Sequence, residues 1–117
     1  MVPGRVLLVL LRISVGLQVV VGLAMWTGHW YQLVGMHRAN GVLFVLVLWS
    51  LAVLALAKGQ RRRTAIIAIT WGIGIAVLGF TQQRLLPGDL HWIVRALHLA
   101  VGVAAMPLAG LLTHTEV

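Results

Sequence analysis

The sequence predicts an all-α membrane protein built as a four-transmembrane-helix bundle, and three observations support this fold class. Hydrophobic residues make up 61% of the 117 residues and charged residues only 9%, whereas a soluble domain has roughly 45–50% and 25%. The apolar residues fall into four stretches of about 20 residues, the length at which a helix crosses about 30 Å of hydrocarbon. Apolar side chains surround each stretch, so its surface suits lipid or other helices rather than water.

The four predicted spans are separated by short polar or turn-forming segments. The first span follows Arg5 and continues to Trp26, and the second ends before the basic segment 58–63. The third ends before a turn at residues 86–89, where the side chain of Asp89 is expected to cap the last helix. We expect one domain over residues 1–117, with spans at residues 6–26, 33–57, 64–82 and 90–112.

The positive charges predict the orientation of the chain in the membrane. Arg5 and the basic segment 58–63 fall on one side of the spans, against Arg38 and Arg84 near the other. Because cytoplasmic segments carry the excess of Lys and Arg, both termini are expected to be cytoplasmic. Aromatic residues, which are favoured at the headgroup level, fall at the predicted outer boundary: Trp26, Trp30, Tyr31 and Trp92. We expect an integral protein of a prokaryotic cytoplasmic membrane, embedded in the lipid bilayer.

The composition also excludes several classes of function. The chain has no cysteine, so disulfides, thiolate metal sites and thiol catalysis are excluded. Asp89 and Glu116 are its only carboxylate side chains, which is too few for a carboxylate-bridged di-iron site. The net charge is +7, but no basic block projects from a soluble domain, so we expect no nucleic-acid partner.

Two histidines interrupt the apolar pattern inside the predicted spans, where polar groups are costly and indicate functional sites. His37 lies early in the second span and His98 lies about two to three turns into the fourth. Both are therefore expected at a similar depth in the outer half of the bilayer. Each is followed four residues later by a glycine, Gly41 or Gly102, and residues four apart share a helix face. The pattern predicts two walls of one pocket for a flat cofactor held by imidazole.

The cofactor that best suits this pocket is haem b, which needs two axial histidines, an apolar slot and cationic groups near its propionates. His37 and His98 are the expected iron ligands. Arg38 adjoins the first histidine and Arg95 lies three residues before the second, so these two arginines are the expected partners of the propionates.

Other interpretations of these residues stay open at this point. Glycines at fourth positions also let transmembrane helices pack closely, and a histidine can hydrogen-bond across helices without any ligand. An arginine near a helix end can extend along the lipid to a phosphate. Zinc or copper would need three or four ligands, and His29 and His91 would have to complete such a set.

Short motifs along most of the chain resemble one half of the haem A synthase family, whose members are membrane proteins made of two four-helix halves. The matching segments are Gln18-Val-Val-Val-Gly22, His37-Arg38, Val77-Leu-Gly79 with Thr81, and Leu97-His98-Leu99. In that family each half holds a haem between histidines near the outer ends of its second and fourth helices. The resemblance implies the same role for His37 and His98.

The chain departs from this family at two features. The family's catalytic half has a glutamate three residues before the first histidine, where this chain has Val34, and many members have an outer cysteine pair, which is absent here. We therefore expect a b-type haem protein that transfers electrons in the membrane, with a quinone or a larger redox complex as partner, and no haem A synthase activity. The alternative is a non-catalytic accessory subunit of a respiratory or photosynthetic complex, without its own cofactor.

Overall fold

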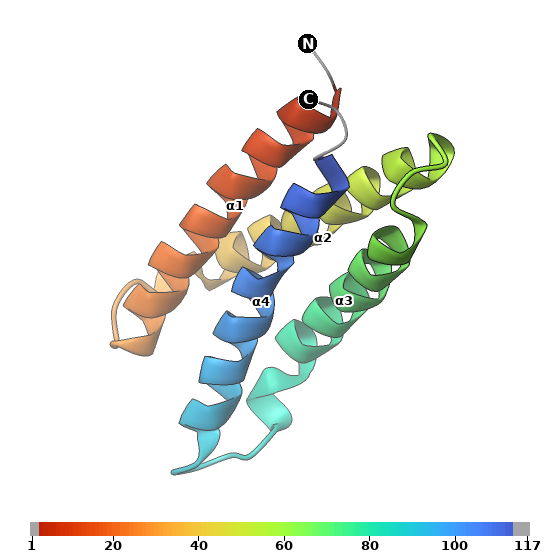
Figure 1. Ribbon diagram of the computed structural model, residues 1–117. Helices are drawn as coiled ribbons and strands as arrows, with labels where there is room; N and C mark the ends of the chain where they lie inside the picture. Colours follow the sequence, from red (N-terminus) through yellow and green to blue (C-terminus); the bar gives the residue numbers. More distant parts are fainter. Residues whose placement is uncertain (1–2, 114–117) are drawn as a thin grey trace.

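The computed structural model describes residues 3–113 as four long helices and two short 3-10 turns, with no strand in that range (Figure 1). The elements are α1 (Pro3–Trp26), η1 (Tyr31–Leu33), α2 (Val34–Ala57), α3 (Arg62–Thr81), η2 (Gln82–Arg84) and α4 (His91–Thr113). A helix is present at each of the four predicted spans, and the largest difference in bounds is at α1, which begins at Pro3 instead of residue 6. Each of the four is long and apolar enough to cross a membrane.

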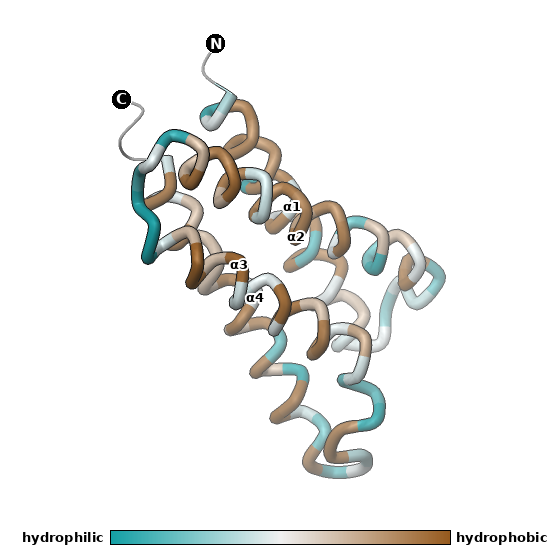
Figure 2. Tube along the Cα trace, turned by 90° about the vertical axis from the view of Figure 1, so that its right-hand side faces the viewer, coloured by the Kyte–Doolittle hydropathy of each residue, from teal (hydrophilic) through white to brown (hydrophobic). Residues whose placement is uncertain are grey.

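The helices run alternately up and down and close into a bundle. α1 packs on α2, α2 on α3, and α3 on α4, while α4 also contacts α1 and α2. The α1–α2 and α3–α4 connections lie at one end of the bundle, and the α2–α3 connection lies at the other (Figure 1). The longest dimension is 46 Å, close to the roughly 40–45 Å of a bilayer with its headgroup regions. Hydrophobic residues cover the middle of the helices, and hydrophilic residues gather towards the two ends (Figure 2).

Glycines in the left-handed conformation let the chain turn after the first two helices. Gly28 and Gly59 have φ angles of 88° and 66°, which glycine adopts without the steric cost that a Cβ would bring. Around Gly28 the His29 N–H donates to the Ala24 carbonyl at 2.7 Å, and α2 ends with the same pattern around Gly59. These bonds satisfy carbonyl groups that the helix ends would otherwise leave without a partner.

The start of α4 corrects the prediction for Asp89. The helix begins at His91, whose N–H donates to the Gly88 carbonyl at 3.1 Å. Asp89 makes no side-chain hydrogen bond within residues 3–113. Because the backbone of the turn already satisfies this N–H, the Asp89 carboxylate is not needed as a cap.

Small residues pack the helices tightly in the half of the bundle that contains the start of α1 and the end of α4, which we call the packed half. Its fully buried residues are Leu11, Leu48, Ala52, Ala65, Ala68, Ala105 and Ala109. Alanine lets transmembrane backbones approach closely, and close approach is the main source of packing energy in lipid. Indole N–H groups add hydrogen bonds between neighbouring helices, from Trp49 to the Ile69 carbonyl at 3.1 Å and from Trp71 to the Val101 carbonyl at 2.8 Å.

Candidate functional site

A cavity of about 420 Å³ opens between the helices towards the α1–α2 and α3–α4 connections, away from the packed half. We call this part of the bundle the cavity half. All four long helices contribute to the lining, and aromatic side chains form part of it. The residues on which the site depends are Gln18 and Gly22 from α1, His37, Arg38 and Gly41 from α2, Gly79 from α3, and Arg95, His98 and Gly102 from α4.

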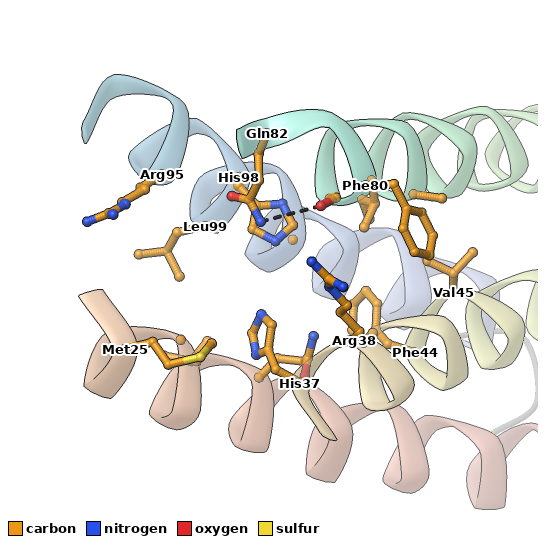
Figure 3. Close-up of a pocket in the computed structure, with 18 of the residues that line it drawn as sticks. Met25, His37, Arg38, Phe44, Val45, Phe80, Gln82, Arg95, His98 and Leu99 are labelled. Atoms are coloured by element: carbon orange, nitrogen blue, oxygen red, sulfur yellow. Dashed lines mark hydrogen bonds between the residues drawn. The ribbon is translucent and has the colours of Figure 1, made fainter. Parts of the chain in front are cut away.

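His37 and His98 enter this cavity from α2 and α4 and face each other across it (Figure 3). Both side chains are half-buried. The Nδ1 atom of each ring is buried and has no hydrogen-bond partner within residues 3–113. Nε2 of each ring also makes no hydrogen bond in that range, but it is accessible. A buried polar atom without a partner costs about 1–3 kcal/mol, so the cavity holds both rings at some cost to the stability of the fold.

A glycine of the preceding helix supports each imidazole. A Cβ atom added at Gly22 of α1 would lie 3.3 Å from Cε1 of His37, and one added at Gly79 of α3 would lie 3.4 Å from Cε1 of His98. The α1–α2 hairpin and the α3–α4 hairpin therefore present their histidines in the same way. This support between helices has no signal in the spacing along one helix, which is why sequence analysis missed it.

The two glycines that the sequence singled out both line the cavity, but their surroundings differ. A Cβ at Gly41 would lie 2.9 Å from Nε2 of Gln18, whereas a Cβ at Gly102 would meet no atom of the described residues within 4 Å. Gly41 therefore makes room for a neighbouring side chain, and Gly102 borders open space. One face of α4 includes Arg95 and His98, which line the cavity, and continues to the buried Ala105 of the packed half.

The two arginines line the same cavity in different ways. Arg38 is directed into the cavity, whereas the guanidinium group of Arg95 extends away from the two imidazoles (Figure 3). Neither makes an ion pair or a hydrogen bond within the described part of the chain. The only carboxylate side chain in that part is Asp89, because Glu116 lies outside the described residues.

Three polar side chains between α1 and α2 form a hydrogen-bonded cluster next to the cavity. Ser14 Oγ donates to Asn40 Oδ1 at 3.0 Å, and Asn40 Nδ2 donates both to the Ser14 carbonyl at 2.9 Å and to Gln18 Oε1 at 3.0 Å. Ser14 is only 3% exposed. Gln18 and Asn40 are polar residues inside predicted spans, but the sequence does not indicate Ser14 as their partner.

Among the described residues, His29 and His91 do not complete a metal site with His37 and His98. Nδ1 of His29 lies 3.3 Å from Thr27 Oγ1, and Nδ1 of His91 lies 3.0 Å from the Leu85 carbonyl oxygen. Residues 3–113 contain no group of three or more His, Asp or Glu side chains placed to hold a metal ion. This arrangement does not support the zinc or copper alternative, which needs three or four ligands.

Comparison with known proteins adds no relative to this picture. No protein family, no curated protein and no solved structure matches the chain. The chemistry of the cavity therefore rests on its own residues, which supply two opposed imidazoles, an apolar wall, arginine guanidinium groups and glutamine amides.

Proposed function

We propose that this integral membrane protein binds one haem b between His37 and His98 and transfers electrons within the membrane. The observation that carries this proposal is the pair of imidazoles from α2 and α4, which face one cavity with accessible Nε2 atoms and no hydrogen-bond partner within residues 3–113. A ring nitrogen that is free to coordinate is what an axial ligand requires. Both rings rest against glycines, which limits steric crowding beside a flat ligand.

The residues around the histidines also suit this group. The aromatic and aliphatic lining provides an apolar slot, and Arg38 brings a positive charge that needs an anionic partner inside a membrane span. When bound, the haem would supply one-electron chemistry, and two histidine ligands leave no open iron position, which favours electron exchange over oxygen activation. The resemblance to one half of the haem A synthase family supports the same histidine roles, while Val34 in place of the family's glutamate argues against synthase activity.

The setting proposed for this electron transfer is a prokaryotic cytoplasmic membrane with both termini in the cytoplasm, as the basic segment 58–63 favours. The cavity half would then lie in the outer leaflet. A quinone dissolved in the membrane or a larger redox complex would exchange electrons with the haem.

One observation favours a second candidate function, that of an accessory subunit without a cofactor. Three glycines on different helices are exposed, and a Cβ at each would have no atom of residues 3–113 within 4 Å. They are Gly16, Gly35 and Gly74. Outward-facing glycines suit close contact with the helices of a partner. In that case the histidines of the cavity would serve packing alone.

An absorption spectrum of the purified protein in detergent, after haem is supplied, separates the two functions. Haem binding predicts a Soret band with the sharp visible bands of low-spin iron. His37→Ala and His98→Ala should each abolish the low-spin form or leave a weakly held high-spin haem. A low-spin spectrum that survives in both variants would refute the ligation, and a wild type without a Soret band would favour the accessory subunit.

A further inference from the structure

The side chain of Gln18 is held in one orientation by the cluster that joins α1 and α2. The Ser14 carbonyl oxygen can only accept a hydrogen bond, so the atom of Asn40 at 2.9 Å from it must be the amide nitrogen. The same nitrogen lies 3.0 Å from the amide of Gln18. Because Asn40 donates here, the atom of Gln18 that it meets must be the oxygen.

The remaining end of the Gln18 amide is therefore a donor with a fixed direction. Nε2 has no hydrogen-bond partner within residues 3–113 and is not buried. It lies beside Gly41, where a Cβ would come within 2.9 Å of it, and Gln18 lines the cavity together with His37. The Ser14 carbonyl thus orients the Asn40 amide, and Asn40 in turn orients the Gln18 amide. An N–H group of Gln18 therefore faces the cavity from α1.

A second donor in the same cavity carries a full positive charge. Arg38 lies two residues before Asn40 on α2 and is directed into the cavity (Figure 3). It has no ion-pair partner in the part of the chain that the structure describes. A charged group inside a membrane span pairs with an opposite charge when one is available. A donor amide and a guanidinium group in one cavity together match a carboxylate, which accepts hydrogen bonds and carries no donor when ionised.

We propose that Gln18 and Arg38 bind a carboxylate of the porphyrin, with Asn40 as the positioning residue that fixes the Gln18 amide. This inference rests on the proposed function for the identity of the ligand, but it concerns different residues and different atoms from the iron ligation. It predicts that the cavity recognises a propionate from the α1–α2 side even when no iron is present.

The test uses protoporphyrin IX without metal and its dimethyl ester, because neither can form an iron–histidine bond. Both are titrated into the purified full-length protein in nanodiscs and followed by porphyrin fluorescence. The measured quantity is the ratio of the two affinities, since a general loosening of the bundle weakens both ligands alike. We expect the wild type to prefer the free acid by roughly tenfold or more, the scale of a hydrogen bond to a charged group.

Variants at position 18 should change this ratio in a defined order. Gln18→Met removes the donor at similar size and should largely remove the preference. Gln18→Glu keeps an acceptor for Asn40 but presents a negative charge to the ligand, so the ester should then bind at least as well as the acid. Gln83→Met makes the same replacement at another cavity-lining glutamine and should leave the ratio unchanged.

Substitutions elsewhere in the cluster test the role of Asn40. Asn40→Ala frees the Gln18 amide to rotate and should lower the ratio by less than Gln18→Met does. Ser14→Ala keeps the backbone carbonyl that orients Asn40, so the ratio should stay close to that of the wild type. Equal losses in all three variants would indicate a merely structural cluster and overturn the positioning role.

The outcomes separate this inference from the haem proposal. Equal ratios in the wild type and Gln18→Met would overturn the inference even if the low-spin haem spectrum is present. A ratio that depends on Gln18 would support it even if no iron ligation is found, and His37→Ala and His98→Ala should leave the ratio intact. Displacement of protoporphyrin IX by equimolar oleate would assign the two donors to a lipid carboxylate and overturn the porphyrin assignment.

Discussion

The packed half and the cavity half are made from the same four helices, but their inward-facing positions differ in residue type and in packing. In the packed half, alanines such as Ala52, Ala68 and Ala109 are fully buried and bring the backbones together. In the cavity half, half-buried imidazoles lie against glycines, and their Nδ1 atoms have no partner among the described residues. Local departures from complete packing and complete hydrogen bonding are expected at functional sites. Close packing in the packed half holds the four helices in position. The cavity half can therefore contain buried polar groups that lower the stability of the fold.

The largest effect on stability is expected from a substitution that breaks the packed half. At Gly72 of α3 an added Cβ would overlap Nε1 of Trp49 and lie 3.0 Å from its Cδ1 atom, and this indole also donates to the Ile69 carbonyl. Gly72→Ala should lower the free energy of unfolding by about 1–3 kcal/mol, the usual cost of overpacking. Unfolding of the purified protein in detergent, followed by circular dichroism, measures the change.

Gly74 provides the matched control, because it lies on the same helix and a Cβ there would meet no atom within 4 Å in the part of the chain that the structure describes. Gly74→Ala should leave the stability unchanged or raise it slightly, since alanine is the better helix former. If both variants lose the same stability, the contact with Trp49 does not account for the effect.

The second-largest effect is expected at Gly102 in the cavity half, and it concerns the affinity for haem. Gly102 borders open cavity space, so Gly102→Ala should not disturb the protein without haem. If a flat ligand fills that space, the added methyl group should lower haem affinity by roughly tenfold, as overpacking does elsewhere. Gly110→Ala on the same helix, where a Cβ also meets no atom of the described residues within 4 Å, should leave haem affinity unchanged. Titration of both variants with haem decides the matter, and equal affinities would contradict the placement of the ligand beside Gly102.

The positions of the four helices follow from the sequence, because a membrane imposes a strong rule on length and hydropathy. The two cavity histidines can also be predicted from the sequence, since polar groups are costly inside a membrane span and indicate functional sites. The sequence does not predict how each helix is rotated about its own axis. Apolar side chains surround the helices, so no periodic pattern shows which residue of α1 will face His37, and the contact with Gly22 appears only in three dimensions.

The hydrogen-bonded cluster next to the cavity is a second feature that the sequence does not predict. A serine in a transmembrane helix usually bonds a carbonyl of its own helix, as Ser50 does with the Leu46 carbonyl at 2.8 Å. Ser14 instead bonds Asn40 of the next helix. The sequence does not distinguish these two serines, since only the packing of α1 on α2 brings a partner to Ser14.

A smaller effect distinguishes the two arginines of the cavity half. Removing a positive charge near the iron disfavours the reduced state, so Arg38→Ala should lower the midpoint potential of the haem. Since about 59 mV corresponds to a tenfold change for one electron, we expect a decrease of some tens of millivolts. Arg95→Ala should have a smaller effect, because its guanidinium group extends away from the imidazoles (Figure 3). Equal shifts of the midpoint potential in the two variants, measured by redox titration, would contradict this dependence on the direction of the side chain.

The smallest effect is expected at His29 and His91, the two other histidines among the described residues. His29 and His91 have Nδ1 partners in Thr27 and the Leu85 carbonyl, whereas the Nδ1 atoms of the cavity histidines have none in residues 3–113. His29→Ala and His91→Ala should therefore keep the low-spin spectrum. His91 also lines the cavity and holds the turn before α4, so its loss should weaken haem binding slightly without changing the ligands. A high-spin spectrum in His91→Ala would instead place this residue on the iron and would require a different partner for His37.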